Sequence, residues 1–279
     1  MSTGQRWFIT GCSTGLGRAL AEAVLDNGGR AVITARDPRS LDPLVERYGD
    51  RAVALALDLN RPDQVAEAAR RAASAYDGLD VLVNNAGYGL VGAVEETDPA
   101  EYRPLFETNF FATVELTRAL LPLFRRQRRG RIINISSIAA MAPRPGYGFY
   151  AATKAALEAV SESLAQELRP LGIAVTLVEP GPFRTDWAGR SLQLADTAID
   201  DYADTSGASR QAVRERNGRQ AGDPARAARV IMAAAQAEQP PLRLPLGSFP
   251  YRRMREKLGE IEGELAQWED RAGAAVEFD

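Results

Sequence analysis

The feature that most constrains this chain is a regular alternation of short apolar runs with longer amphipathic ones. Each apolar run is a few residues long and ends in glycine, asparagine or charge, which is typical of strands buried on both faces. The predicted strands cover residues 6–10, 30–35, 51–57, 79–84, 130–136 and 173–179. Apolar residues at helical spacing fill the intervals, over residues 17–28, 62–76, 99–127 and 150–172. The alternation predicts an α/β fold, a doubly wound parallel sheet with helices on both faces.

The same pattern predicts a single domain over residues 1–279. Residues 6–185 hold the regular alternation and form the predicted cofactor-binding and catalytic core. Residues 186–222 are rich in Ser, Thr, Asp, Arg and Gly and contain no predicted strand. Because an insertion of this length beside a ligand site is usually a lid, we expect it to cover the substrate. Residues 223–279 are predicted to hold a last helix, a strand at 241–246 and a C-terminal helical extension.

The charge composition argues against a nucleic-acid partner, because 34 Lys and Arg residues are outweighed by 37 Asp and Glu residues. The one basic cluster, Arg125 to Arg131, follows a helical pattern, which is typical of a solvated helix C-terminus. The chain begins without the pattern of a signal peptide, and no apolar run is long enough to cross a bilayer. We therefore expect a cytoplasmic protein with no nucleic-acid and no membrane partner.

Metal chemistry is not expected either. The chain has no histidine, and its one cysteine, Cys12, allows neither an internal disulfide nor a thiolate cluster. Because the carboxylates are not clustered, no metal site is predicted. A single cysteine also suits a reducing cytosol.

A glycine-rich turn follows the first predicted strand, in the sequence TGCSTGLGRAL from Thr10 to Leu20. The turn leads directly into a helix, whose first backbone N–H groups and dipole attract a pyrophosphate. Gly11 permits the tight turn, Gly15 a close approach of the ligand, and Gly17 close packing of helix on strand. The predicted dinucleotide contacts of this turn are Gly11, Ser13, Thr14, Gly15, Leu16 and Gly17. The alternative is a plain loop rich in small residues.

The end of the second strand predicts which dinucleotide binds. Sites for NAD usually carry an acidic residue there, which binds the ribose hydroxyls. In the sequence VITARDP, Ala35 and Arg36 come first, and the first acid is Asp37. The Arg36 guanidinium, with Ser13 and Thr14 nearby, suits a 2′-phosphate. The sequence therefore favours NADP (NADPH) as the cofactor; the alternative is a solvent-facing Arg36 paired with Asp37.

Taken together, the motifs resemble those of one family. The patterns TG-x-x-x-G-x-G at Thr10, NNAG at Asn84, NISS at Asn134, Y-x-x-x-K at Tyr150 and PG at Pro180 follow one another in this chain. Their order and spacing resemble the classical short-chain dehydrogenases/reductases. Each motif alone is weak, but their joint occurrence over residues 6 to about 185 is specific. The resemblance implies a seven-stranded Rossmann sheet and a nicotinamide cofactor.

The resemblance also implies the residues of the site. It implies a catalytic tetrad of Asn109, Ser137, Tyr150 and Lys154. Ser137 is preferred to Ser136 because it lies thirteen residues before the tyrosine, as in the family, while Ser136 would point off the other strand face. The remaining cofactor contacts that it implies are Asp58, Leu59, Asn85, Ala86, Gly87, Tyr150, Lys154, Pro180, Gly181, Phe183 and Thr185.

These residue types suit hydride transfer to a carbonyl group. A ketone that accepts hydride becomes an alkoxide and needs a proton, which Tyr150 can donate. Lys154, one helical turn further on the same face, would stabilise the phenolate. Ser137 could donate a hydrogen bond to the substrate oxygen as charge develops. Asn109 is a poor helix former within a helical pattern, which suits a polar role such as holding a relay water; the alternative is a solvent-facing side chain.

The residues expected around the substrate are mostly apolar, so a small hydrophobic carbonyl compound or alcohol is predicted. They are Leu90, Val91, Ala139 to Pro143, Tyr147, Pro182, Phe183 and Trp187, although several could simply pack under the lid. The predicted function is an NADP(H)-dependent oxidoreductase that interconverts a hydrophobic ketone or aldehyde and its alcohol, with tyrosine as acid and base. The alternatives are an NADP-binding sensor or scaffold without turnover, and an isomerase or epimerase. The complete tetrad argues against the first, and the NNAG turn and chain length against the second.

The C-terminal segment, residues 251–271, has one apolar stripe. Its members recur at steps of four and three residues and are Met254, Leu258, Ile261, Leu265 and Trp268. Basic residues crowd the N-terminal half and acidic residues the C-terminal half, against the helix dipole, and Gly259 and Gly263 weaken the helix further. We expect the stripe to be buried, either against its own subunit beside the lid or in a homodimer or homotetramer.

Overall fold

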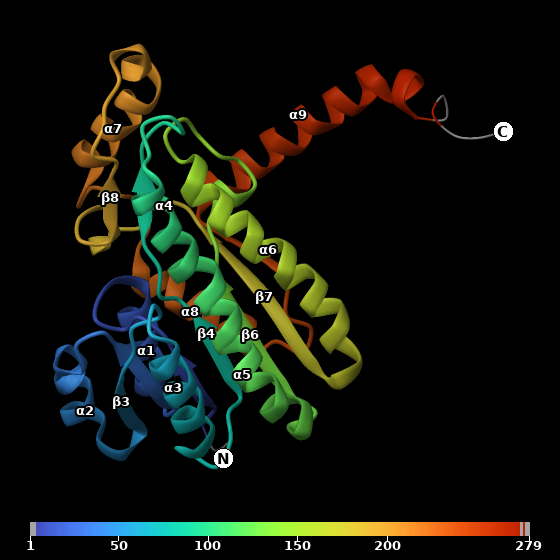
Figure 1. Ribbon diagram of the computed structural model, residues 1–279. Helices are drawn as coiled ribbons and strands as arrows, with labels where there is room; N and C mark the ends of the chain where they lie inside the picture. The colour runs from blue at the N-terminus through green and yellow to red at the C-terminus, as the bar shows by residue number, and fades with distance from the viewer. Residues whose placement is uncertain (1–3, 274–275, 277–279) are drawn as a thin grey trace.

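The computed structural model describes residues 4–273 and 276 and centres on a seven-stranded, fully parallel sheet (Figure 1). The strands follow the order β3 (Ala52–Ala56), β2 (Arg30–Ala35), β1 (Arg6–Ile9), β4 (Val81–Asn84), β6 (Gly130–Ile135), β7 (Ile173–Pro180) and β9 (Arg243–Leu246). The predicted fold, a single α/β domain with a doubly wound sheet, is confirmed. The domain predictions for residues 1–3, 274–275 and 277–279 lie outside the described residues.

Strand β1 illustrates why the apolar runs are continuous. It pairs with β2 on one side and with β4 on the other, so that Phe8 lies beside Val32 and Leu82. Successive side chains of a strand point to opposite faces. Trp7 accordingly packs into one buried cluster and Phe8 into the other. Both faces of the strand are therefore covered, as the sequence predicted.

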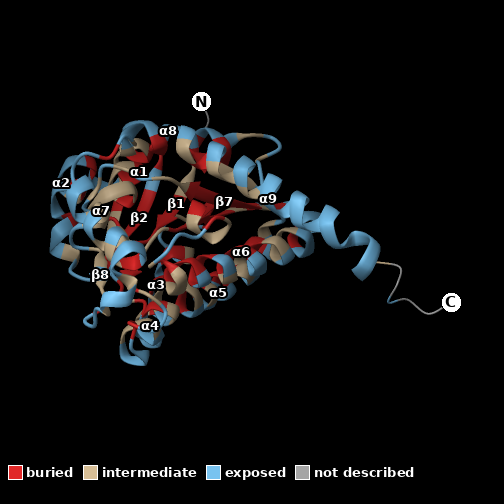
Figure 2. Ribbon diagram, turned by 90° about the horizontal axis from the view of Figure 1, so that it is seen from above, coloured by how far each residue is buried: buried red, intermediate tan, exposed pale blue. Residues whose placement is uncertain are grey.

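Helices form a layer on each face of the sheet, and the buried residues lie between the layers (Figure 2). One face is covered by α1 (Gly15–Asp26), α2 (Asp42–Tyr48) and α8 (Pro224–Gln236). The other is covered by α3 (Pro62–Ser74), α5 (Ala112–Gln127) and α6 (Gly148–Leu168). Among the described helices, none combines the length and hydropathy needed to cross a lipid bilayer.

Three elements depart from the sequence predictions in the first half of the chain, one of them the unpredicted three-residue strand β5 (Gly89–Val91). The short helix α2 was not predicted, because its seven residues are too few to establish a helical period. The helix predicted over residues 99–127 is interrupted by a π-helical segment, Glu107–Phe111, which separates α4 (Pro99–Phe106) from α5. Interruptions of this kind are frequent at functional sites.

The expectation that residues 186–222 contain no strand is wrong. Strand β8 (Leu192–Leu194) lies in this segment and pairs in parallel with β5 (Gly89–Val91), forming a second, two-stranded sheet. The segment also contains a second π-helical turn, Ala203–Gly207, and helix α7 (Ala208–Arg216). A three-residue strand carries too short a pattern to be recognised, and its partner lies about a hundred residues away in the chain.

Helix α9 (Ser248–Ala272) leaves the body of the molecule and extends away from it (Figure 1). Its first turn packs on the body, where Pro250 is buried, but Leu258, Leu265 and Trp268 are at least half exposed. The expectation that the apolar stripe packs against its own subunit beside the lid is therefore wrong. Ion pairs along the helix, such as Arg253 with Glu256 and Lys257 with Glu260, support it locally instead.

Candidate active site

A cleft of about 1030 Å³ opens at the carboxyl ends of the central strands, beside the point between β1 and β4 where the strand order reverses. This is where doubly wound sheets bind ligands. All of the predicted site residues except Gly17 and Asn109 line it. The lining residues that were predicted are Gly11, Ser13, Thr14, Gly15, Leu16, Arg36, Asp58, Leu59, Asn85, Ala86, Gly87, Ser137, Tyr150, Lys154, Pro180, Gly181, Phe183 and Thr185.

The glycine turn between β1 and α1 is held against the turn that follows β4. Gly11 has a φ of +71°, and a Cβ atom there would lie 2.9 Å from Ala86 Cα. The Asn85 side-chain amide donates to the carbonyl oxygens of Thr10 and Gly11, at 2.8 and 3.0 Å. A Cβ atom on Gly17 would collide with the Gly11 carbonyl oxygen and the Asn85 amide. Gly17 thus allows helix α1 to approach the turn, although it does not line the cleft.

An arginine that sequence reasoning missed also reaches this turn. Arg190 extends from the segment after β7 and donates a 2.8 Å hydrogen bond to the Thr14 hydroxyl. The guanidinium lines the cleft together with Ser13 and Gly15. No local motif marks Arg190, because it lies far from Thr14 in the chain and is brought there by the fold.

Arg36 lines the cleft directly after β2. The neighbouring Asp37 does not pair with it. The Asp37 carboxylate instead forms an ion pair with Arg39 at 2.7 Å and accepts from the Arg39 backbone N–H. The Arg39 guanidinium, through a direct hydrogen bond, lowers the pKa of Asp37. The alternative in which Arg36 is neutralised by Asp37 is therefore not the observed arrangement.

Tyr150 lies in the first turn of α6, with its ring buried between Tyr147 and Trp187. Burial raises the pKa of Tyr150 to about 12, although its hydrogen bond with Ser137 acts in the opposite direction. The phenol therefore carries its proton at neutral pH. Ser137 follows the end of β6, and its hydroxyl oxygen also accepts from the Ala139 backbone N–H at 3.1 Å. The structure thus brings Tyr150 and Ser137 together, as predicted.

Lys154 lies one helical turn beyond Tyr150 and is only 5% exposed. Its ammonium group donates a 3.0 Å hydrogen bond to the Ile135 carbonyl oxygen at the end of β6. Burial lowers the pKa of Lys154 to about 8, while the Glu158 carboxylate opposes that shift. The predicted Tyr150 and Lys154 pair thus shares one buried helix face beside the cleft.

Asn109 lies in the π-helical segment between α4 and α5 and is 1% exposed, so the solvent-facing alternative is excluded. Its side-chain oxygen accepts from the Tyr88 backbone N–H at 3.1 Å. Its amide donates to the Tyr88 carbonyl oxygen and to the Thr153 hydroxyl, at 2.9 and 3.2 Å. Asn109 thereby fixes the turn after β4 to the helix that carries Tyr150 and Lys154. A Cβ atom on Gly87 would lie 2.9 Å from the Asn109 side-chain oxygen, which shows how closely these parts approach.

A buried charged cluster behind Lys154 was not found from the sequence. Glu158, one turn further along α6, accepts from the Ser136 hydroxyl at 2.5 Å and from Arg243 at 2.7 Å. Arg243 also contacts Glu162 and Glu179. Burial, together with the nearby Glu158 carboxylate, raises the pKa of Glu179 to about 7. Ser136 also lines the cleft, but its hydroxyl is bound to Glu158 in this cluster, in agreement with the choice of Ser137.

The substrate side of the cleft differs in part from the expected wall. Ala139, Ala142, Tyr147, Pro182, Phe183 and Trp187 line it. Leu90 and Val91, by contrast, do not line it and pack with Leu105 and Tyr150. Their prediction as wall residues was wrong, as was that of Ala140, Met141 and Pro143, which do not line the cleft either. Two cations were missed: Arg144, whose guanidinium carbon lies 5.0 Å from the Tyr147 ring centre, and Arg216 on α7.

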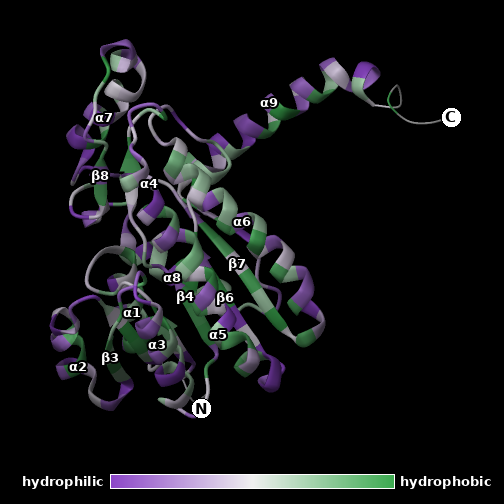
Figure 3. Ribbon diagram, viewed as in Figure 1, coloured by the Kyte–Doolittle hydropathy of each residue, from purple (hydrophilic) through white to green (hydrophobic). Residues whose placement is uncertain are grey.

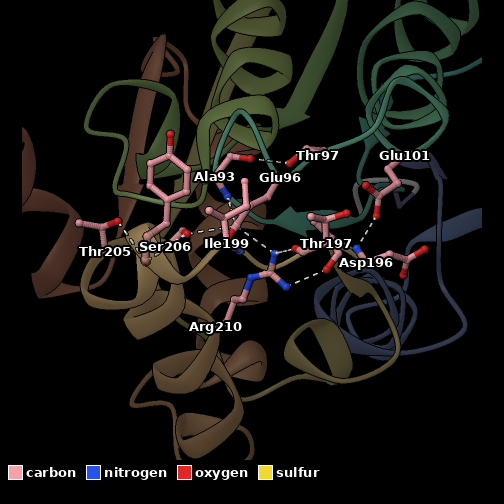
Figure 4. Close-up of polar contacts among 12 residues, drawn as sticks. Ala93, Glu96, Thr97, Glu101, Asp196, Thr197, Ile199, Thr205, Ser206 and Arg210 are labelled. Atoms are coloured by element: carbon pink, nitrogen blue, oxygen red, sulfur yellow. Dashed lines mark hydrogen bonds and ion pairs between the residues drawn. The ribbon is translucent and has the colours of Figure 1, made fainter.

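Segment 186–222 is attached to the body through the buried carboxylate of Glu96 (Figure 4). This carboxylate accepts from the backbone N–H groups of Ala93 and Ile199 and from the Ser206 hydroxyl, and forms a 3.0 Å ion pair with Arg210. Burial alone would raise the pKa of Glu96, but these hydrogen bonds outweigh it and lower the pKa to about 2. Arg210 also donates to the carbonyl oxygens of Ala195 and Thr197.

Comparison with known proteins agrees with this geometry. Residues 5–194 match the family model described as short chain dehydrogenase. An oxidoreductase of Botryotinia fuckeliana, BOA17, is 38% identical over 242 residues, which cover 86% of this chain and 88% of that protein.

Two solved structures are also similar. A short-chain dehydrogenase from Streptomyces avermitilis is 42% identical with a TM-score of 0.91, covering 97% of this chain and 98% of its own. A metagenomic short-chain oxidoreductase in complex with NADP is 32% identical with a TM-score of 0.69, covering 88% of this chain and 97% of its own. The parallel sheet, the glycine turn and the matches over most of the chain lead to one conclusion: the protein belongs to the short-chain dehydrogenase/reductase family of oxidoreductases.

Proposed function

We propose that this protein is an NADP(H)-dependent oxidoreductase that interconverts a hydrophobic ketone or aldehyde and its alcohol. The observation that carries the proposal is the convergence of Tyr150, Ser137 and Lys154 on one wall of the cleft. Tyr150 holds its proton at neutral pH, because burial raises the pKa of its phenol to about 12. A protonated tyrosine beside a hydroxyl donor suits the reduction of a carbonyl group.

The residues of the cleft fit a nicotinamide dinucleotide. The glycine turn supplies backbone N–H groups at the start of α1, with Gly11 and Gly15 at positive φ, so that a pyrophosphate can approach the backbone closely. Asp58, Leu59, Pro180 and Thr185 also line the cleft. In the proposal Asp58 and Leu59 frame the adenine, and Pro180 and Thr185 lie along the nicotinamide. When bound, the cofactor supplies the hydride of the reaction.

The preference for NADP rests on Arg36. Its guanidinium lines the cleft beside Ser13, Thr14 and Ser40, whereas the nearest acid, Asp37, is paired with Arg39. A guanidinium at this position suits the 2′-phosphate through charge-assisted hydrogen bonds. Relatives of this fold bind NAD as well as NADP, so the choice depends on this residue rather than on the fold.

Each of the other predicted residues has a distinct role in the proposal. Tyr150 donates the proton to the carbonyl oxygen during reduction and removes it during oxidation. Ser137 donates a hydrogen bond to the same oxygen as negative charge develops there. Lys154 favours the phenolate through its positive charge. Asn109 holds the turn after β4 against α6 and keeps Tyr88 and Thr153 in place.

Residues 186–222 form the substrate lid of the proposal. Trp187, Gln193, Ser209 and Val213 from this segment line the cleft, with the Trp187 ring beside that of Tyr150. The large apolar rings at the reacting end favour a hydrophobic substrate. Arg144 and Arg216 are exposed and also line the cleft, so they could bind a polar end of the substrate.

The test is an assay of NADPH oxidation with a panel of carbonyl compounds of increasing apolar character. We expect turnover with apolar aryl or alkyl ketones or aldehydes, weaker turnover with NADH, and none with polyhydroxylated sugars. Binding of NADPH in a fluorescence titration without turnover of any carbonyl compound would contradict the proposal. That result would favour a sensor or scaffold function instead.

A further inference from the structure

The C-terminal helix α9 presents most of its length to solvent (Figure 2). Only its first turn is fixed to the body, through Phe249 and the buried Pro250, which packs on Gly181. A Cβ atom on Gly181 would lie 2.9 Å from Pro250 Cδ. The remaining turns extend beyond the sheet and its helical layers (Figure 1). A helix this exposed buries no apolar face within its own subunit.

The exposed part of α9 nevertheless carries an apolar stripe with a strict seven-residue repeat. The stripe consists of Tyr251, Met254, Leu258, Ile261, Leu265 and Trp268. Leu265 is 66% exposed and Trp268 58% exposed. Apolar residues recur along this otherwise polar helix in Figure 3. Alternating steps of three and four residues form the seam of a coiled coil, in which each helix buries its stripe against another helix.

The charges beside the stripe indicate which partner helix covers it. In the heptad repeat the charged positions next to the seam are Arg255 and Lys257 in the first half, and Glu262, Glu264, Glu269 and Arg271 in the second half. Charged residues at these positions set the choice and the direction of the partner helix. The basic half of α9 meets the acidic half of a second copy when two such helices run in opposite directions.

We propose that two copies of this chain pair through α9 as an antiparallel coiled coil. Full overlap of the two stripes places Leu258 opposite Ile261 of the second copy, and Met254 opposite its Leu265. In the same register Tyr251 meets Trp268. The pairing is independent of the reaction proposed above.

The same register also pairs the flanking charges. Arg255 lies beside Glu262 of the second copy, and Lys257 lies beside its Glu264. Each of these pairs occurs twice, because the arrangement has twofold symmetry. A parallel arrangement would instead place Lys257 beside Glu262 of the second copy but Glu264 beside its Glu269, so that an attractive contact is offset by a repulsive one. The charge pattern therefore selects the antiparallel pair.

The pairing has a consequence for the cleft. Phe249 and Arg253, in the first two turns of α9, line the cleft, and Pro250 packs on Gly181 after β7. A second copy that holds α9 in place also holds this part of the wall. The paired state therefore keeps this part of the cleft in one arrangement, whereas an isolated α9 is anchored near its N-terminus alone.

Disulfide cross-linking tests the direction and the register. Met254→Cys and Leu265→Cys are prepared as separate proteins, since the one natural cysteine, Cys12, is fully buried. In the antiparallel pair the same introduced cysteine in the two copies is separated by about 16 Å along the helix axis, given a rise of 1.5 Å per residue. That distance is too long for a disulfide. We expect cross-linked dimers in the mixture of the two proteins and none in either protein alone.

The control is Asp270→Cys, because Asp270 lies on the face of α9 opposite the stripe and should cross-link with neither variant. Cross-linking of Met254→Cys with itself would show a parallel pair and overturn the proposal. No cross-link in the mixture would also overturn it. If the wild-type protein is then monomeric and binds phosphatidylserine vesicles, the stripe meets a membrane surface instead of a second copy.

Charge reversal tests the partner choice. One variant combines Arg255→Glu with Lys257→Glu, and the other combines Glu262→Lys with Glu264→Lys. Each variant alone should pair at least about tenfold more weakly than the wild type, because four favourable pairs become repulsive. An equimolar mixture should recover the pairing, measured by analytical ultracentrifugation of the two labelled proteins. Equal self-association of each variant and the wild type would contradict the proposed contacts.

Discussion

The Lys154 ammonium nitrogen lies 6.0 Å from the centre of the Tyr150 ring, and both side chains are buried on one face of α6. Burial shifts their proton affinities in opposite directions: it raises the pKa of Tyr150 to about 12 and lowers that of Lys154 to about 8. The tyrosine is therefore the group that holds a proton for transfer across the neutral range. The lysine is the group that loses its positive charge just above neutral pH.

This difference predicts a pH dependence of ketone reduction. Lys154 is charged below pH 8 and loses its proton as the pH rises through about 8. Because the ammonium charge favours the phenolate that remains after proton transfer, kcat/KM for reduction should fall above that pH. The measurement is a profile of kcat/KM with NADPH between pH 6 and pH 10. A profile that stays flat over this range would contradict the role of Lys154.

Arg36→Ala should change the cofactor preference. The loss of a charge-assisted contact with the 2′-phosphate costs about 1.5–3 kcal/mol, which is about a 10- to 100-fold rise in KM for NADPH. The KM for NADH, which lacks that phosphate, should change little. Arg39→Ala is the matched control, because Arg39 is exposed and pairs with Asp37. Equal effects of Arg36→Ala on both cofactors would show that Arg36 does not bind the phosphate.

The two adjacent serines should respond differently to alanine substitution. Ser137→Ala removes the hydroxyl that lines the cleft and should lower kcat while the free energy of unfolding stays near that of the wild type. Ser136→Ala leaves the buried Glu158 carboxylate without the hydrogen bond that it accepts at 2.5 Å. That loss should reduce the free energy of unfolding by about 1–3 kcal/mol, measured by urea denaturation. Similar kinetic losses in both variants would invalidate the choice of Ser137.

Glu96→Gln should loosen the attachment of the lid. The substitution keeps the shape of the side chain but removes the negative charge. That charge forms the ion pair with Arg210 and strengthens three hydrogen bonds that the carboxylate accepts. Amide hydrogen exchange over residues 195–210 should become at least about tenfold faster, since a hydrogen bond to a charged group contributes about 1.5–3 kcal/mol. Glu115→Gln, an exposed position on α5, is the control. Unchanged exchange in the Glu96 variant would show that other contacts hold the lid.

The same carboxylate predicts an acid sensitivity of the lid. The pKa of Glu96 is lowered to about 2 in the folded protein, below the ordinary value of 4.5. Its contribution to stability is therefore fully present above pH 4.5 and is lost as the pH falls towards 2. Exchange over residues 195–210 should accelerate in that range in the wild type, after correction for intrinsic rates, and not in Glu96→Gln. An identical acid response in both proteins would contradict this attribution.

Much of the sheet could be predicted because its strands are buried on both faces and are therefore continuously apolar. The glycine turn and the Tyr150 and Lys154 pair could be predicted because their spacing is local. Strand β8 could not, since it consists of three residues whose partner β5 is distant in the chain. Arg190 and the Glu96 attachment depend on tertiary contacts in the same way. Helix α9 was recognised from its period, but its stripe does not pack on its own subunit, because the helix leaves the body after one turn.

The most direct test of the proposed reaction is a comparison of Tyr150→Phe with the wild type in the same NADPH-dependent carbonyl reduction. The substitution removes the phenol hydroxyl and almost no volume, so cofactor binding should remain as in the wild type. Turnover should fall by about 10²- to 10⁴-fold, the range that general acid catalysis contributes. Near wild-type turnover by Tyr150→Phe, with NADPH bound equally well, would contradict the assignment of Tyr150 as the proton donor.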